Sequence, residues 1–136
     1  MNTFYLRVLA SNETFYEGEC LSLTVPTPDG EREFLAHHSN MIAAVVPGEL
    51  RAKLPDGKTG IAAVSEGILK AEHNEVLVLA DTVERPEEID ANRAREKEAE
   101  AKEAVLQKRS IQEYKMAQAA LAREISRLKV KSRYGI

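Results

Sequence analysis

The sequence has a single cysteine, Cys20, which excludes any disulfide within the chain. It also lacks a long apolar run, because no stretch approaches the roughly 18 apolar residues that a membrane-spanning helix needs. The first ten residues, MNTFYLRVLA, contain neither the basic region nor the apolar segment of a secretory signal peptide. These absences predict a soluble protein of a reducing, cytoplasmic compartment, which can still belong to a complex at a membrane.

Catalytic and metal-binding motifs are equally scarce. The chain contains no G-x-S-x-G elbow, no P-loop and no G-x-G-x-x-G motif. His37 and His38 are neighbours, so in a strand their side chains would face opposite ways, and His73 stands alone before Asn74 in a predicted turn. We therefore expect no metal site and no catalytic residue. The chain is interpreted as a binding or regulatory protein rather than a self-sufficient enzyme.

Charge is divided unevenly along the chain. Residues 1–86 carry 13 acidic and 7 basic side chains, whereas residues 87–136 carry 9 acidic and 12 basic ones. The excess of positive charge is greatest in residues 108–136, with 8 basic and 2 acidic side chains. The two ends of the molecule should therefore prefer different partners.

Turn signals divide residues 1–85 into short strands. Residues 20–25 alternate apolar and polar side chains and end at Pro26-Thr27-Pro28-Asp29-Gly30, and Pro55-Asp56-Gly57 is the strongest hairpin signal in the chain. Short strands between frequent turns are typical of an all-β sandwich or barrel rather than a parallel α/β sheet. The predicted strands cover residues 4–9, 20–25, 41–46, 49–54, 61–65, 68–72 and 76–80.

The remainder, residues 86–136, is predicted to be helical, because residues 87–134 contain neither glycine nor proline. Pro86 suits the first position of a helix, and the acidic residues just after it complement the helix macrodipole. Lys108-Arg109-Ser110 suggests a break, with Ser110 as the N-cap of a second helix. Each helix then carries a narrow apolar stripe, and packing the stripes together predicts an antiparallel two-helix hairpin. The first stripe is Ile89, Ala94, Ala101, Ala104 and Val105; the second is Ile111, Tyr114, Gln118, Leu121, Ile125 and Leu128.

One short motif invites a functional interpretation. Asp90 and Arg93 are three residues apart near a helix start, so they project from one face. The simplest interpretation is a surface ion pair, which contributes little to stability. A functional interpretation makes Arg93 a phosphate or base contact and Asp90 a polar anchor. Arg123 and Arg127 form an i, i+4 pair that a folded hairpin would aim at the same cleft, or they are simply part of a basic helix face.

Six short segments follow one another at characteristic spacings: residues 17–19 (EGE), 46–50 (VPGEL), 65–69 (SEGIL), 76–82 (VLVLADT), 89–94 (IDANRA) and 122–130. In their order and spacing, these segments resemble the epsilon subunit of the bacterial F-type ATP synthase, called delta in mitochondria. The resemblance runs nearly end to end.

The resemblance implies a non-catalytic, two-part subunit of the central stalk. A ten-stranded sandwich would bind the gamma subunit and the c-ring. The helical hairpin would fold on the sandwich or extend into the alpha/beta catalytic head, where it restrains ATP hydrolysis. The subunit would couple proton flow to ATP synthesis at the cytoplasmic face of the cell membrane, as a peripheral part of the complex and without a nucleic-acid partner.

The resemblance also implies a regulatory ligand. No cofactor is required, but residues 89–94 look like the nucleotide-binding motif of some bacterial members, and bound ATP would hold the tail folded. The implied ATP contacts are Ile89, Asp90, Arg93, Ala94, Arg123, Arg127 and Glu84.

A different class of protein remains open from the residues alone. The chain could be a cytoplasmic adaptor whose basic coiled-coil tail binds nucleic acid or an anionic membrane surface. Such binding would weaken steeply with salt and would be lost on removal of residues 108–136.

Overall fold

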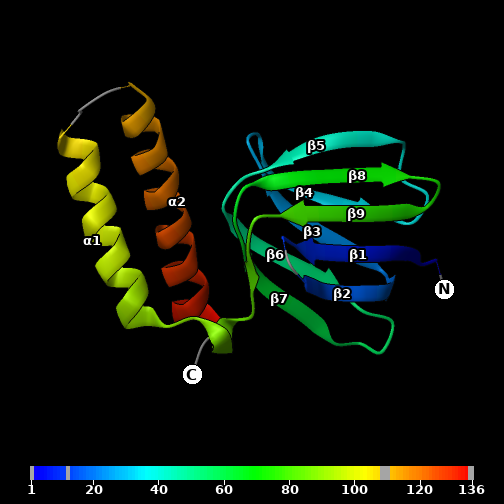
Figure 1. The fold of residues 1–136 in the computed structure, drawn as a ribbon. Coiled ribbons are helices and arrows are strands. Elements are labelled where there is room, and N and C mark those ends of the chain that lie inside the picture. Colours follow the sequence, from blue (N-terminus) through cyan, green and yellow to red (C-terminus); the bar gives the residue numbers. More distant parts are fainter. Residues whose placement is uncertain (1, 12, 108–110, 135–136) are drawn as a thin grey trace.

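The computed structural model describes residues 2–11, 13–107 and 111–134. Within these ranges the chain forms ten strands, one short 3₁₀-helix and two α-helices. The strands make two sheets stacked as a sandwich, and the two α-helices stand side by side next to it (Figure 1). The predicted fold class, an all-β N-terminal sandwich with a C-terminal antiparallel two-helix hairpin, is confirmed.

Each sheet has five strands. The first sheet has the order β2-β1-β9-β8-β5, in which β1 and β9 are parallel and every other pair is antiparallel. The second sheet has the order β10-β7-β6-β3-β4 and is antiparallel throughout. The first sheet consists of β1 (Phe4–Ala10), β2 (Glu13–Cys20), β5 (Met41–Val45), β8 (Gly67–Glu72) and β9 (Glu75–Ala80). The second consists of β3 (Ser22–Thr27), β4 (Gly30–Leu35), β6 (Gly48–Lys53), β7 (Thr59–Val64) and β10 (Val83–Glu84).

The core lies between the sheets and follows from the period-two pattern of the strands. In β1, Phe4, Leu6 and Val8 are buried, whereas the residues between them face outward. Val76 and Val78 of β9 and Leu23 and Val25 of β3 add to the same cluster. Because every strand supplies only one face to the core, the outer faces remain available for other contacts.

Turn chemistry explains the hairpins. Gly57 adopts a φ of +87°, which a side chain would disfavour, and its N–H donates to the Leu54 carbonyl at 3.0 Å. His73 and Asn74 connect β8 to β9 with φ angles of +52° and +59°, a conformation that favours asparagine. The turns predicted at residues 55–57 and 73–74 are therefore confirmed.

One predicted strand needs correction, and three strands were missed wholly or in part. Residues 20–25 are not one strand: Cys20 ends β2, and β3 runs from Ser22 through Pro26 to Thr27. Pro26 is tolerated because β3 pairs with β6 only from Ser22 to Thr24. Strands β4 and β10, and most of β2, had no counterpart among the strands that the sequence predicts.

The predicted helix start at Pro86 is also wrong. Pro86 opens the 3₁₀-helix η1 (Pro86–Glu88), and α1 (Ala91–Gln107) begins only after Asp90. The reason is a side-chain cap, because the Asp90 carboxylate accepts a hydrogen bond from the Arg93 N–H at 3.1 Å. The second helix, α2, spans Ile111–Tyr134, so the predicted break lies between the helices. The predicted cap at Ser110 lies outside the described residues.

The hairpin packs on the sandwich through α2. This helix contacts β6, β7 and η1, while α1 packs along α2. Ala94 and Ala101 of α1 are buried, as the predicted stripe requires, whereas the stripe members Ala104 of α1 and Gln118 of α2 are exposed. No helix in the described ranges is long and apolar enough to cross a membrane.

Candidate functional site

Within residues 89–94, some side chains stabilise the fold and one lines a surface cleft. Ile89 is buried against Ala63 of β7 and Val130 of α2, so it anchors the start of the hairpin on the sandwich. Asp90 is the helix cap described above. Ala94 has no exposed surface, which lets α1 and α2 approach closely. Arg93 is exposed and is the member of this group that lines a cleft.

This cleft, the junction cleft, lies where β10, η1 and the two helices meet. It has a volume of about 460 Å³, within the range of small-molecule sites. Its lining residues come from both the sandwich and the hairpin. They are Ala10, Ser11, Glu13, Asp81, Thr82, Val83, Glu84, Glu88, Arg93, Lys97, Arg123, Glu124 and Arg127.

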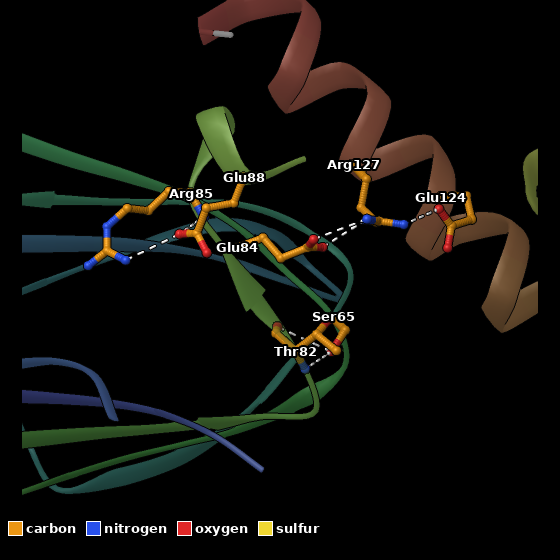
Figure 2. A network of polar contacts seen from close by, with 7 residues as sticks. All are labelled: Ser65, Thr82, Glu84, Arg85, Glu88, Glu124 and Arg127. Carbon is orange, nitrogen blue, oxygen red and sulfur yellow. Dashed lines mark hydrogen bonds and ion pairs between the residues drawn. The ribbon is translucent and has the colours of Figure 1, made fainter. Parts of the chain in front are cut away.

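Two short connections place Glu84 in the cleft. The N–H of Thr82 donates to the Ser65 hydroxyl at 2.7 Å, which ties the segment before β10 to the end of β7 (Figure 2). Strand β10 then pairs with β7 at Val83 and Glu84. Val83 points into the core, so Glu84 must face outward, toward α2.

Arg127 is the centre of the polar contacts across the junction. Its guanidinium donates to both carboxylate oxygens of Glu84, at 2.7 and 3.0 Å, and to Glu124 at 2.8 Å (Figure 2). Glu124 is buried, with 5% of its surface exposed, so its charge needs this partner. Burial alone would lower the pKa of Arg127, but the hydrogen bonds to Glu84 and Glu124 outweigh it and the pKa is raised. The guanidinium therefore remains charged and links α2 to β10.

A second ion pair crosses the same junction. Arg123 donates to Glu66 at 2.8 Å, which joins α2 to the connection between β7 and β8. Its Nε atom is buried without a hydrogen-bond partner among the described residues.

Two cations of α1 complete the cleft. Arg93 and Lys97 are four residues apart on one helix face, and neither side chain makes an ion pair within the described part of the chain. In total, four cations and five carboxylates line the cleft. Arg123 and Arg127 are neutralised by glutamates, so an anion entering the cleft would first meet Arg93 and Lys97.

The histidines do not form a site. The His38 ring packs against Phe34 with centroids 4.7 Å apart, and His73 pairs with Glu72 on the surface. In residues 2–11, 13–107 and 111–134, no group of three histidine, cysteine, aspartate or glutamate side chains is arranged to hold a metal ion.

Two family models match the chain. One, described as "ATP synthase, Delta/Epsilon chain, beta-sandwich domain", matches residues 3–86. The other, described as "ATP synthase, Delta/Epsilon chain, long alpha-helix domain", matches residues 87–132. The chain belongs to the ATP synthase delta/epsilon chain family.

Curated relatives are similar over almost their whole length. The ATP synthase epsilon chain of Ruminiclostridium cellulolyticum is 40% identical over 133 residues, covering 98% of each chain. That of Clostridium novyi is 37% identical over 128 residues, covering 94% of this chain and 97% of the relative. The resemblance to the epsilon subunit is thus confirmed.

Solved structures share the fold at low sequence identity. A chain in the cryo-EM structure of the Euglena gracilis mitochondrial ATP synthase OSCP/F1/c-ring superposes with a TM-score of 0.79 at 20% identity, covering 93% of this chain and 79% of that one. A chain of the Tetrahymena thermophila central stalk and c-ring superposes with a TM-score of 0.60 at 10% identity, covering 97% and 96%.

In this delta/epsilon chain, the structure brings together four of the seven residues that the sequence placed in the ATP site. Glu84, Arg93, Arg123 and Arg127 line the junction cleft, whereas Ile89, Asp90 and Ala94 do not. The sequence missed Lys97, although its spacing of four residues from Arg93 was a usable signal. It also missed Glu124, whose burial depends on how α2 packs.

Proposed function

We propose that this delta/epsilon chain is a non-catalytic subunit of the rotary stalk at the cytoplasmic face of the cell membrane. In this proposal the sandwich anchors it to the gamma subunit and the c-ring. The hairpin leaves the sandwich reversibly to restrain ATP hydrolysis in the alpha/beta head, while the complex couples proton flow to ATP synthesis. One combination of features carries the proposal. The sandwich has an uncovered apolar face, and the contact between the hairpin and the sandwich consists of a small apolar cluster and several ion pairs.

The anchoring surface is the outer face of the first sheet. Ile42 on β5, Ile68 on β8 and Leu79 on β9 are 71%, 55% and 47% exposed. Ile68 and Leu79 are direct cross-strand partners, and Ala44 lies opposite Ile68 on the other side, so the exposed side chains are contiguous. Contiguous exposed apolar side chains mark interaction sites, which supports a protein partner on this face. The hairpin contacts β6 and β7 of the other sheet.

Reconstitution tests this anchoring. The chain mixed with gamma and the alpha/beta head should give a stoichiometric complex with altered ATP hydrolysis, and Ile68→Glu should weaken assembly at least tenfold, because it buries a charge in the interface. Leu35→Glu is the matched control, since Leu35 is 51% exposed on β4 of the opposite sheet. Absence of a complex at micromolar concentration would contradict the proposal.

The contact between hairpin and sandwich favours reversible docking. Its apolar part is small: Ile89, Ala63 and Val130 are buried together, with Ile61 at the margin. Its ion pairs separate without leaving a buried charge alone, because Glu124 keeps Arg127 on the same helix when Glu84 is left behind. A contact of this kind costs little to open and can be shifted by a partner that binds the open hairpin better.

We further propose that the junction cleft binds the phosphates of ATP as a regulatory ligand. Arg93 and Lys97 supply unpaired positive charge, and Arg123 and Arg127 can exchange a glutamate for a phosphate. The lining spans the sandwich and both helices, so a nucleotide there would stabilise the docked hairpin. The five carboxylates of the cleft oppose phosphate binding and favour the magnesium complex over free ATP.

Calorimetry with the isolated chain tests the ATP site. Magnesium–ATP should raise the melting temperature, and Arg93→Ala should weaken binding about tenfold through the loss of a charged hydrogen bond. Arg95→Ala is the matched control, because Arg95 is exposed on the same helix and does not line the cleft. No heat and no stabilisation at millimolar ATP would refute the site without affecting the anchoring proposal.

A further inference from the structure

A groove lies where strand β10 stops, between the edges of the two sheets. It has a volume of about 410 Å³ and shares no lining residue with the junction cleft. The first half of β7 forms one side, β2 forms the other, and the residues after β10 close one end. We call it the edge groove. Its lining residues are Phe15, Tyr16, Leu54, Thr59, Gly60, Ile61, Arg85, Pro86, Glu87 and Tyr134.

The first half of β7 has no neighbouring strand on this side. Strand β10 pairs only with Val64 and Ala63 of β7. The chain then reaches Pro86, which in this register would stand opposite Ile61 and has no N–H to continue the ladder. Beyond that point, the free side of β7 receives no hydrogen bond from any described residue. This free edge is regular, because β7 pairs with β6 along its whole length without a register shift.

The alternation of the ladder identifies the backbone groups that face the groove. On one side of β7, the Ser65 N–H donates to the Thr82 carbonyl at 3.1 Å. On the other side, the Lys58 carbonyl accepts from the Leu54 N–H at 2.9 Å. Successive residues of an antiparallel strand bond to opposite sides. The odd-numbered residues of β7 therefore point toward the β10 side, and the even-numbered ones toward β6.

The odd-numbered residues that line the groove are Thr59 and Ile61, and they flank a glycine. Each presents an N–H and a carbonyl to the groove, whereas the absent side chain of Gly60 leaves space on the inner face. A Cβ atom at Gly60 would have one neighbour within 4 Å, the Ala52 carbonyl oxygen at 3.9 Å. A glycine within a strand often marks the close approach of another backbone. The half-buried side chains around this space are Phe15, Tyr16 and Leu54.

The opposite wall limits what the groove accepts. Strand β2 is bulged at Phe15, which has no partner on β1, so β2 offers no regular edge for pairing. The Arg85 guanidinium lies 4.3 Å from the centroid of the Phe15 ring and pairs with Glu88. Glu87 is exposed, lines the groove and forms no ion pair with a described residue. An occupant therefore pairs with β7, and a basic residue is favoured near Glu87.

We propose that the edge groove binds an extended segment of a partner protein, which adds a strand to β7. The segment exchanges backbone hydrogen bonds with Ile61 and Thr59. It carries an aromatic or large aliphatic side chain opposite Gly60 and a basic residue next to Glu87. In strand addition of this kind, the backbone bonds supply affinity and the pocket for a side chain supplies specificity. The segment uses none of the exposed apolar residues proposed for anchoring, so this contact is separate from that one.

Fluorescence anisotropy of the full chain with a labelled peptide tests the inference. The probe is a capped pentapeptide of lysine, threonine, phenylalanine, threonine and valine, which runs antiparallel to β7 with its phenylalanine opposite Gly60. We expect saturable binding at or below millimolar concentration. N-methylation of both threonines removes the donors that face β7 and should weaken binding at least tenfold. N-methylation of the phenylalanine, whose N–H faces away from β7, should change binding less than about twofold.

Two protein variants complete the test. Gly60→Val fills the space on the inner face and should weaken binding at least tenfold, while its Cβ atom meets no backbone closer than 3.9 Å. Glu33→Val places the same side chain on the exposed edge strand β4, outside the groove, and should leave binding unchanged. Hydrogen exchange reports on the bonded atoms. At ten times the dissociation constant of the peptide, the Ile61 and Thr59 amides should exchange about elevenfold more slowly.

The inference is overturned if the pentapeptide does not bind at millimolar concentration, if methylation of the threonines is tolerated, or if Gly60→Val binds like the unmodified chain. Equal binding of N-acetyl-phenylalanine amide would also overturn it, because the groove would then hold a small apolar ligand and not a strand. Self-association of the chain that Gly60→Val abolishes would overturn it in favour of a second copy. None of these measurements involves ATP or the rest of the complex.

Discussion

Cys20, at the end of β2, has no exposed surface, and its thiol donates to the Ser22 carbonyl at 3.1 Å. Burial disfavours the thiolate and raises the pKa of Cys20 to about 11, while a backbone interaction at Ser22 that favours the thiolate opposes this rise. The folded state therefore holds the proton more tightly than the unfolded chain. The contribution of the protonated Cys20 thiol to the stability of the folded state is complete below the pKa of the unfolded chain, near 9.0. This contribution is lost as the pH rises toward 11.

We accordingly expect an alkaline loss of stability that depends on this one residue. Between pH 8 and pH 10.5, ionisation of Cys20 should lower the free energy of unfolding by about 2 kcal/mol. Urea unfolding of the unmodified chain and of Cys20→Ala at each pH gives the difference between their free energies of unfolding. Taking this difference removes the contribution of the tyrosines and lysines, which both proteins share. A pH-independent difference between the two proteins would show that the thiol is not protected by folding.

The motif at residues 89–94 shows what single residues reveal before a structure is known. The anion contact at Arg93 stays a prediction, which rests on an arginine without an ion-pair partner among the described residues near a helix start. The capping role of Asp90 was also within reach, because aspartate before a helix is a common cap. The burial of Ile89 and Ala94 beside α2 was harder to predict from the sequence. Val130 lies far along the chain, and only the docked hairpin brings it to Ile89.

At the scale of elements, the strands with an alternating pattern or a short apolar run between turn signals were predicted, and the strands without either were not. Strand β4 carries Glu31, Arg32 and Glu33 in succession and buries only Phe34, so its sequence shows no apolar face. It lies at the edge of its sheet, where charged side chains protect against unwanted pairing. Strand β10 has two residues, too few for any pattern.

The helices show a similar limit. The break after Gln107 and the alanine-rich seam followed from composition and spacing. The inward face of α2 could not be predicted in the same way, because Glu124 and Ser126 are buried there. From sequence alone, a polar residue is expected on the surface of a helix. The ion pair with Arg127 accounts for the burial of Glu124.

For the whole molecule, the sequence predicted two domains but not the contacts that hold them together. Among these contacts are three charged pairs, each between α2 and a sandwich carboxylate: Arg123 with Glu66, Arg127 with Glu84, and Arg133 with Glu49. The partners are between 43 and 84 residues apart in the sequence. No local pattern connects residues at such separations, so only the docked arrangement identifies them.

Of the three pairs, the one at Glu49 offers the cleanest test of docking. Its carboxylate is 13% exposed and receives Arg133 and Tyr134 from the end of α2 while Arg51 holds it in place on the sandwich. Replacing Glu49 by Gln removes the charge that attracts Arg133 and weakens the Tyr134 contact. We expect amide protection of α2 to fall about two- to fivefold at low salt, the range of a solvent-accessible ion pair.

The salt dependence decides whether this loss is electrostatic. Arg133 is 67% exposed, so molar salt should screen its pair and bring the unmodified chain to the protection of Glu49→Gln. Glu31→Gln is the matched control, because Glu31 pairs with the same Arg51 and forms no ion pair or hydrogen bond with a described residue of the hairpin. If Glu31→Gln lowers protection equally, the effect arises within the sandwich. If neither variant changes protection, the hairpin is held by its apolar contact and by the Arg123 and Arg127 pairs alone.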